Sequence, residues 1–247
     1  MGKMVCIHKN IEDLISTAAA NIASLLIQAC CLRGNAYISL SGGFTPTGVY
    51  KALAQDQYRN SVPWSSVHFF WGDERCVSPE DPESNYRYAY DNLLKDIPVD
   101  PEYVHRIKGE FSPQKAASDY THVLAGFAEA DHPWPIFDIA VMGMGEDGHT
   151  ASLFPGMFNP GENIKPVIQV NTTYQNRPAS RVTLTPLVFN SSRNVIFLVA
   201  GDAKAEALQK ALSDKNDLKN IPVQRIQPAQ GNLIWHVDSA AGKFLLE

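Results

Sequence analysis

The chain has 247 residues, of which 45% are hydrophobic and 19% charged, the size and composition of an ordinary soluble globular protein. Its formal net charge of −5 argues against nucleic acid or an anionic membrane as the main partner, although a local cluster of cations could still hold a small anion. No stretch approaches 18 uninterrupted apolar residues and the N-terminus lacks a signal-peptide pattern, so we expect a cytoplasmic protein with no membrane partner.

The four cysteines predict neither disulfides nor a metal site. Cys6, Cys30, Cys31 and Cys76 form no CxxC pair and have no metal-ligand spacing. We therefore expect buried free thiols in a reducing compartment.

Helical and strand patterns alternate through the first half of the chain. Apolar residues recur at helical spacing from Ile11 to Ala29, and Asn10 stands where an N-cap is needed. Thr45 and Pro46 likewise predict the N-cap and first residue of a helix that runs through Leu53. The other elements expected before residue 137 are strands over 36–40 and 67–71, an exposed loop over 76–84, a helix from Ser84 to about Lys95, and a helix from Ser112 to about Ala130.

The second half of the chain begins with an apolar strand over 137–142. Asp202 is then predicted to cap a helix that contains Lys204. The other elements expected are short β segments over 167–170 and 181–185, a fully buried strand over 194–200, a last strand over 232–238, and a short alanine-rich helix behind it. Because strands alternate with helices throughout, we expect one domain over residues 1–247, an α/β fold with a doubly wound, mostly parallel sheet and helices on both faces.

The loop after the central strand carries the main chemical candidate. Gly143-Met-Gly-Glu-Asp-Gly-His-Thr150 holds three glycines within six residues, which lets the backbone approach a ligand closely. Asp147 and His149 are presented at a strand end, where open α/β sheets bind their ligands. We interpret this loop as the chemical centre.

Two other interpretations of this loop remain weaker. The spacing Gly143-x-Gly145-x-x-Gly148 matches the dinucleotide fingerprint, but that loop should open a long helix, which Pro155-Gly156 would interrupt here. The acid expected about 20 residues further on is also missing, since residues 164–170 contain none. Asp147 and His149 could be half of a metal site, but no second pair at ligand spacing stands out.

A second candidate site is the segment Ser41-Gly-Gly-Phe-Thr-Pro46. It lies between a strand and a helix start, where free backbone N–H groups and the helix dipole converge, and Ser41 and Thr45 add hydroxyl groups. It lacks the Gly-Lys-Ser/Thr ending of a nucleoside-triphosphate loop, so a single phosphate monoester fits better. The alternative is a tight turn without a ligand.

Three basic residues are further candidates. Arg181 begins a strand, and Lys204 lies at a helix start, a position that the helix dipole disfavours unless an anion offsets it. A solvated surface position remains the alternative for Lys204. Arg75 follows two acids and could be no more than their ion-pair partner.

Four segments carry a common pattern in order along the chain: Ser41-Gly-Gly-Phe-Thr-Pro46, Trp71-Gly-Asp-Glu-Arg-Cys-Val77 with Ser84-Asn85-Tyr86, Gly143-Met-Gly-Glu-Asp-Gly-His-Thr-Ala-Ser-Leu-Phe-Pro-Gly156, and Arg181-Val-Thr-Leu-Thr185. Together they resemble the 6-phosphogluconolactonases. The resemblance spans roughly Ser39 to Ala241 and implies a doubly wound α/β sheet with a few additional strands, a fold shared with glucosamine-6-phosphate deaminase and related to ribose-5-phosphate isomerase.

The resemblance implies hydrolysis of 6-phospho-D-glucono-1,5-lactone without a cofactor or metal. It makes His149 the general base, with Asp147 and Asp73 nearby to orient it or the water, and Arg75 close to the lactone end or to the acids of the site. The residues that it assigns to the 6-phosphate are Ser41, Gly42, Gly43, Thr45, Arg181 and Lys204. The expected partner is the small sugar-phosphate lactone, and the expected state is a monomer or weak homodimer.

Two departures qualify this resemblance. Phe44 stands where the family usually has serine, so phosphate affinity drops if that hydroxyl is a contact and survives if the contact is a backbone N–H. The deaminase branch carries an Asn-Glu-Pro segment whose acid assists ring opening, and Leu153-Phe154-Pro155 stands there instead. The other hypothesis is a catalytically idle sugar-phosphate sensor, which predicts binding without turnover.

Overall fold

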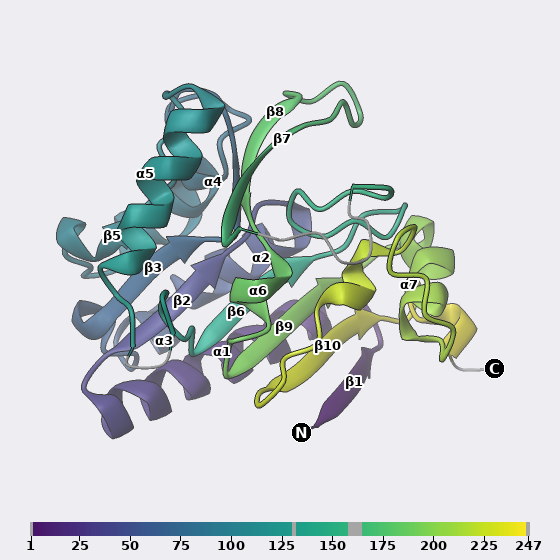
Figure 1. The fold of residues 1–247 in the computed structure, drawn as a ribbon. Helices are drawn as coiled ribbons and strands as arrows, with labels where there is room; N and C mark the ends of the chain where they lie inside the picture. Colours follow the sequence, from purple (N-terminus) through teal and green to yellow (C-terminus); the bar gives the residue numbers. More distant parts are fainter. Residues whose placement is uncertain (1, 130–131, 158–164, 246–247) are drawn as a thin grey trace.

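A seven-stranded parallel sheet forms the centre of the computed structural model, which describes residues 2–129, 132–157 and 165–245 (Figure 1). In spatial order its strands are β1 (Lys3–His8), β10 (Asn232–Asp238), β9 (Asn194–Val199), β6 (Ile139–Gly143), β2 (Ala36–Leu40), β3 (Val67–Trp71) and β5 (Val104–His105). All six neighbouring pairs are parallel. The predicted doubly wound α/β class is therefore confirmed.

A second, smaller antiparallel sheet stands above the carboxyl edge of the large one. Its strands are β4 (Asp73–Arg75), β8 (Ser180–Leu184) and β7 (Val167–Asn171). In Figure 1 the β7–β8 hairpin rises from the sheet and bends over its edge. These are the additional strands that the family resemblance implied.

Helices cover both faces of the large sheet (Figure 1). The α-helices are α1 (Ile11–Arg33), α2 (Phe44–Leu53), α3 (Asp56–Arg59), α4 (Asn85–Asn92), α5 (Pro113–Ala125), α6 (Pro186–Phe189) and α7 (Ala205–Leu212). The 3-10 helices are η1 (Trp64–Ser66), η2 (Leu94–Asp96), η3 (Pro101–Tyr103), η4 (Asp202–Lys204), η5 (Pro222–Arg225) and η6 (Lys243–Leu245).

The predicted capping of α1 is confirmed. Asp13 N donates to Asn10 Oδ1 at 2.8 Å, and Gly34 ends the helix with a φ of 82°, a conformation that glycine adopts without strain. By length and composition α1 could also span a membrane; in the structure one of its faces is buried.

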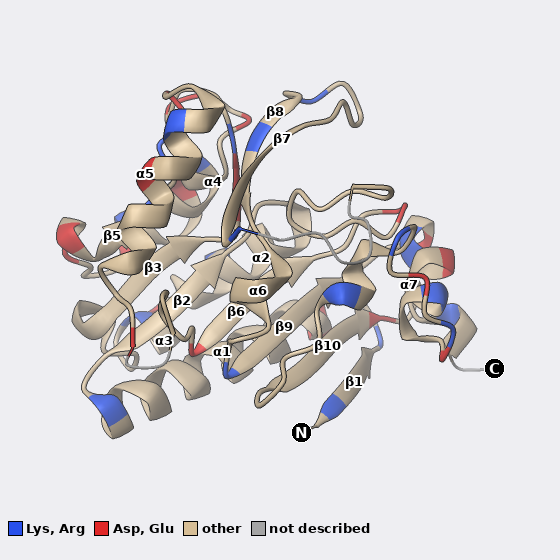
Figure 2. Ribbon diagram, viewed as in Figure 1, with Lys and Arg blue, Asp and Glu red and all other residues tan. Residues whose placement is uncertain are grey.

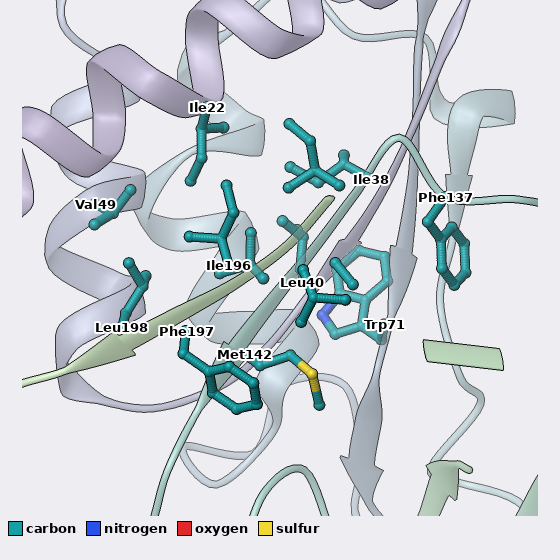
Figure 3. Close-up of a cluster of buried hydrophobic side chains, with 14 of the residues drawn as sticks. Ile22, Ile38, Leu40, Val49, Trp71, Phe137, Met142, Ile196, Phe197 and Leu198 are labelled. Atoms are coloured by element: carbon teal, nitrogen blue, oxygen red, sulfur yellow. The ribbon is translucent and has the colours of Figure 1, made fainter. Parts of the chain in front are cut away.

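The hydrophobic core fills the space between the sheet and its helices. Figure 3 shows Ile22 of α1 and Val49 of α2 projecting toward Ile196 and Leu198 of β9. All four side chains are fully buried. Burial of this kind on both faces explains why β9 and β6 read as continuous apolar runs rather than alternating ones.

The structure corrects the predicted start of α2. The helix begins at Phe44, and Gly43, not Thr45, occupies the N-cap with a φ of 112°. Glycine tolerates that angle, so the chain turns into the helix two residues earlier than a threonine cap at position 45 would require. Thr45 and Pro46 consequently lie inside the first turn, where proline is still tolerated.

The ends of later helices also differ from the prediction. The helix expected to reach Ala130 ends at Ala125, because Gly126 follows. Asp202 does not cap its helix: Gly201 precedes η4, and the Asp202 carboxylate pairs with Lys243 Nζ at 2.7 Å. The alanine-rich segment near the C-terminus forms a turn over 239–242, and only the 3-10 helix η6 follows it among the described residues.

The cysteine prediction is wrong in one respect. Cys6, Cys30 and Cys76 are only partly buried and Cys31 is exposed, although all four are free thiols. The strands β1 and β4 were not expected either. Residues 73–75 read Asp-Glu-Arg, which has no strand pattern, and they become a strand only by pairing with β8.

Candidate active site

A cleft of about 280 Å³ opens at the carboxyl edge of the large sheet. The chain leaves β2 toward β3 and leaves β6 toward β9, on opposite sides, so the adjacent ends of β2 and β6 form a topological switch point. Nine of the ten predicted site residues line this cleft: Ser41, Gly42, Gly43, Thr45, Asp73, Arg75, His149, Arg181 and Lys204. The tenth, Asp147, lies behind His149.

The imidazole of His149 is held by Asp147. Asp147 Oδ1 lies 2.5 Å from His149 Nδ1 and also accepts the His149 backbone N–H at 3.1 Å. Burial acts to raise the pKa of the Asp147 carboxyl, but the hydrogen bonds and charge of His149 outweigh it, and the net pKa is lowered. The carboxylate therefore fixes the tautomer with the proton on Nδ1, which leaves Nε2 able to accept a proton.

Gly145 is required by the position of this ring. A Cβ added there would overlap His149 at Cε1 and Nδ1 and lie 2.8 Å from Asp147 Oδ1. The backbone of the loop closes on itself as well, since Gly145 N donates to His149 O at 2.8 Å and Gly148 N donates to Gly145 O at 3.1 Å. The ring thus occupies the space that a side chain would need.

Two aromatic rings flank the imidazole. Phe154 lies 4.7 Å from His149 between ring centroids, and Tyr174 of the β7–β8 hairpin lies 4.6 Å away at 70°. The hairpin also carries Gln175 and Arg177 to the wall of the cleft. Sequence reasoning assigned none of these three hairpin residues to the site.

The Ser41–Pro46 loop forms another wall of the cleft. Tyr50 Oη accepts Ser41 N at 2.9 Å and donates to Ser41 O at 2.8 Å, so the backbone of Ser41 is fully used. Ser41 Oγ is buried without a partner among the described residues. The Phe44 ring is 83% exposed, so what this residue offers the cleft from the start of α2 is chiefly its backbone N–H.

Two cations face the cleft with few partners: Arg181 is buried and Lys204 is half-buried. Arg181 is 2% exposed; its Nε donates to Pro178 O at 3.1 Å, while Nη2 has no partner within the described part of the chain. The ammonium group of Lys204 has no hydrogen bond or ion pair with any described residue. Burial lowers the pKa of both groups, opposed by Asp73 at Arg181 and by Glu146 and Asp238 at Lys204. Both cationic groups are therefore suited to bind an anionic ligand that enters the cleft from solvent.

Asp73 lies apart from the His149–Asp147 pair. Its Oδ2 accepts Ser152 Oγ at 2.7 Å and its Oδ1 accepts Asn85 Nδ2 at 3.2 Å. Of the two acids that the sequence offered as partners for the imidazole, Asp147 is the one in contact with it.

Arg75 pairs with the chain that follows it rather than with the two acids before it. Its Nη1 donates to Glu83 O at 2.6 Å and lies 3.5 Å from Glu83 Oε2, while Nε is buried without a described partner. Arg177 Nη1 reaches the same Glu83 oxygen at 3.6 Å. Glu83 thus joins two arginines that line the cleft from different elements.

The buried carboxylate of Glu74 organises the neighbouring backbone. It accepts Arg75 N, Asn85 N and Tyr86 N at 2.7–2.8 Å and Ser84 Oγ at 3.0 Å. Burial raises its pKa to about 7 despite the three backbone N–H donors, which act in the opposite direction. Glu74 faces the N-terminus of α4 and not the cleft, so its role is structural.

Charge on the surface is mixed, with basic residues on the β7–β8 hairpin (Figure 2). Among the described residues no group of three or more His, Cys, Asp and Glu side chains could hold a metal ion. The cleft therefore contains an imidazole with a bound carboxylate at one place and buried cations at another, an arrangement suited to proton transfer on an anionic ligand.

Comparison with known proteins gives a consistent result. The profile of the family described as "Glucosamine-6-phosphate isomerases/6-phosphogluconolactonase" matches residues 9–235. A 6-phosphogluconolactonase of Synechocystis sp. is 38% identical over 99% of both chains. The chloroplastic 6-phosphogluconolactonase 3 of Arabidopsis thaliana is 35% identical over 98% of this chain and 75% of its own.

Solved structures share the whole fold. A 6-phosphogluconolactonase from Trypanosoma brucei superposes with a TM-score of 0.86 at 25% identity, covering 98% of each chain. A monomeric glucosamine-6-phosphate deaminase has a TM-score of 0.82 at 21% identity, over 98% of this chain and 99% of its own. The second likeness concerns the fold alone.

Proposed function

The chain is an enzyme of the glucosamine-6-phosphate isomerase/6-phosphogluconolactonase family, and on that premise we propose that it hydrolyses 6-phospho-D-glucono-1,5-lactone to 6-phospho-D-gluconate. The single observation that carries the proposal is the His149–Asp147 pair, held at 2.5 Å on the wall of a cleft that also contains two cations with few partners, Arg181 and Lys204. The pair supplies a base for water, and the cations supply a grip for phosphate.

His149 acts as the general base. Neutral imidazole takes a proton at Nε2 from the water that attacks the lactone carbonyl, while Asp147 keeps the other ring proton on Nδ1 and stabilises the imidazolium that forms. The tetrahedral intermediate then collapses, the ring C–O bond breaks, and the same imidazolium returns its proton to the departing ring oxygen. Water is the only co-reactant: its oxygen and one hydrogen end in the new carboxyl group, and its other hydrogen ends on the released hydroxyl group.

The oxyanion of the intermediate needs a donor or a cation. The N–H groups of Gly145 and Gly148 already donate within their own loop, which favours Arg75 over those two groups for this role. Asp73, held by Asn85 and Ser152, lies close enough to influence Arg181 and orients water or a sugar hydroxyl.

The 6-phosphate is held at the other part of the cleft. Arg181 and Lys204 supply charge, Ser41 Oγ and Thr45 supply hydroxyl groups, and the first turn of α2 supplies N–H groups beside Gly42 and Gly43. Holding the distant phosphate fixes the position of C1 beside the base. At position 44 the contact with the phosphate is the backbone N–H, which phenylalanine keeps, so Phe44 does not abolish binding.

Several coarser features belong to the same proposal. Residues 1–247 act as one domain, because the cleft takes residues from segments spread between Ser41 and Lys204. The protein works in the cytoplasm as a monomer or weak homodimer on a small-molecule substrate, with no nucleic acid, membrane or cofactor required.

The deciding assay is hydrolysis of freshly generated lactone, followed by pH-stat or by a coupled dehydrogenase and corrected for the spontaneous rate. The wild-type protein should exceed the spontaneous rate, and His149→Ala should lower kcat by about 10²–10⁴ without loss of fold. Near-wild-type turnover in that variant would reject the base assignment. Binding of 6-phosphogluconate without any turnover would favour the idle sensor instead.

A matched substrate test separates the two branches of the family. Leu153 and Phe154 are buried where the deaminases carry an acid, so glucosamine-6-phosphate should not be deaminated. Turnover of that amino sugar would contradict the proposal.

A further inference from the structure

Tyr174 lies directly against the ring of His149. The two ring centroids are 4.6 Å apart at an interplanar angle of 70°, so an edge of one ring meets a face of the other. Phe154 approaches His149 at 4.7 Å and 30°, and Phe154 and Tyr174 are themselves 5.8 Å apart. Two aromatic rings from different segments thus close around one imidazole.

The remaining surroundings of the imidazole leave one of its atoms free. Asp147 occupies Nδ1, and the backbone of Gly145 lies against Cε1 and Nδ1. His149 Nε2 has no hydrogen-bond partner among the described residues, and the side chain is 14% exposed at the cleft. The ring is therefore enclosed except at the nitrogen that a reacting water would approach.

Asp147 alone does not fix the plane of the ring. A single hydrogen bond at Nδ1 can persist while an imidazole tips about its Cβ–Cγ bond, and the Asp147 side chain is itself 34% exposed. A reacting group is held to productive geometry by packing of its faces as well as by hydrogen bonds at its edge. The aromatic contacts supply that packing.

The backbone holds Tyr174 in a defined place. Gln175 and Asn176 both have positive φ, 49° and 56°, which makes a two-residue hairpin turn closed by Arg177 N donating to Tyr174 O at 3.0 Å. Arg177 in turn pairs with Glu83. The tip of the hairpin is therefore tied to the body of the protein on both sides of the turn.

We propose that Tyr174 is a positioning residue for the reaction. Its ring, together with that of Phe154, holds the His149 imidazole in the plane that directs Nε2 into the cleft. The role belongs to the ring and not to the hydroxyl, and Tyr174 acts through His149 without touching the reacting atoms. The kinetic part of this inference rests on the proposed lactone hydrolysis; the geometric part does not.

Three variants test the kinetic part. Tyr174→Ala should lower kcat about 10-fold or more while KM changes by less than about threefold, because the base is displaced and the phosphate site is untouched. Tyr174→Phe keeps the ring and should restore kcat. The matched control is Tyr103→Ala, because Tyr103 is also half-buried and its ring centroid lies 4.0 Å from that of another histidine, His68, outside the cleft. This variant should leave kcat unchanged.

A nuclear Overhauser contact tests the geometric part without substrate. His149 Cε1 lies against Gly145, so the His149 Hε1 proton, assigned with His149→Ala, should show a contact to a Gly145 Hα proton. The contact should persist in Tyr174→Phe and vanish in Tyr174→Ala, with both variants still folded by circular dichroism.

The outcomes distinguish the two proposals. A wild-type protein that does not hydrolyse the lactone but shows the expected pattern of contacts would defeat the proposed function and leave Tyr174 as a positioning residue. A Tyr174→Ala variant that keeps both kcat and the Gly145 contact would overturn the inference. Equal loss of kcat in Tyr174→Ala and Tyr174→Phe would also overturn it, because the hydroxyl would then be the active group.

Discussion

Substitution of Gly145 by alanine should displace the proposed base by a predictable amount. The added Cβ would overlap His149 Cε1 and Nδ1, whereas ordinary contact begins at 3.4 Å, so the ring must retreat by about 1 Å. Misplacement of a catalytic group by about 1 Å can lower turnover about 10²-fold. The ring also separates from Asp147, since the new methyl would lie 2.8 Å from Asp147 Oδ1.

The assay is steady-state hydrolysis of fresh lactone, with kcat and KM determined separately. We expect kcat of Gly145→Ala to fall about 10²-fold and KM to stay within about threefold, because the proposed phosphate contacts lie on other segments. Gly143→Ala is the matched control: Gly143 is the last residue of β6, immediately before this loop, it has no positive φ, and its Cβ would meet nothing within 4 Å.

The control should keep kcat within about threefold of wild type. The reasoning fails if Gly145→Ala retains full turnover while the crystal structure of the variant shows the ring displaced. It also fails if Gly143→Ala and Gly145→Ala lose activity to the same extent, since the loop as a whole and not the ring position would then be responsible.

Three further predictions concern the acid partner, a cation and a structural carboxyl. Asp147→Asn should lower kcat about 10- to 100-fold with little change in KM, because a charge-assisted hydrogen bond of about 1.5–3 kcal/mol at Nδ1 is lost; unchanged kcat would contradict this. Lys204→Met should raise KM about 10-fold or more, because a charged contact with the proposed phosphate is lost. It should also raise the free energy of unfolding, because burial lowers the pKa of Lys204 and its charge therefore opposes folding. Steady-state kinetics measures the first effect and urea titration the second. Glu74 has a folded pKa of about 7, above its ordinary value of 4.5, so its contribution to stability is greatest at low pH and falls as pH rises from about 4.5 to 7, by about 3 kcal/mol in all. In Glu74→Gln the difference in unfolding free energy from wild type should therefore change across that window, and a constant difference from pH 4.5 to 8 would refute the assignment.

Most of the architecture could be predicted because its signals are local. The apolar runs of β6 and β9, the Asn10 and Ser84 caps and the glycine after α1 each act within a few residues, and each is found in the structure. The meeting of residues 41–45, His149 and Lys204 at one cleft also followed, because they come after β2, β6 and β9 and the ends of parallel strands meet at one edge.

The second sheet could not be predicted in the same way. β4 reads Asp-Glu-Arg and is a strand only because it pairs with β8, so its existence depends on residues about a hundred positions away. Tyr174 and Arg177 were missed for the same reason, since nothing local says that their turn folds back onto His149. The Gln175-Asn176 pair between two β segments was a usable signal, because asparagine tolerates the positive φ of a tight hairpin turn.

The two sheets contribute different residues to the cleft. The large sheet places His149 and the Ser41–Pro46 loop at rigid strand ends, while the small sheet brings Arg75 opposite Arg181 across the β4–β8 pair. A buried cation without an ion pair among the described residues, such as Arg181, destabilises a folded chain because its desolvation is not offset by a counter-charge. The presence of such a cation beside the proposed base is explained if an anionic ligand supplies the missing charge. On this reasoning the cost in stability and the affinity for a phosphate have a single origin, which is why Lys204→Met should raise the free energy of unfolding while it lowers the affinity for phosphate.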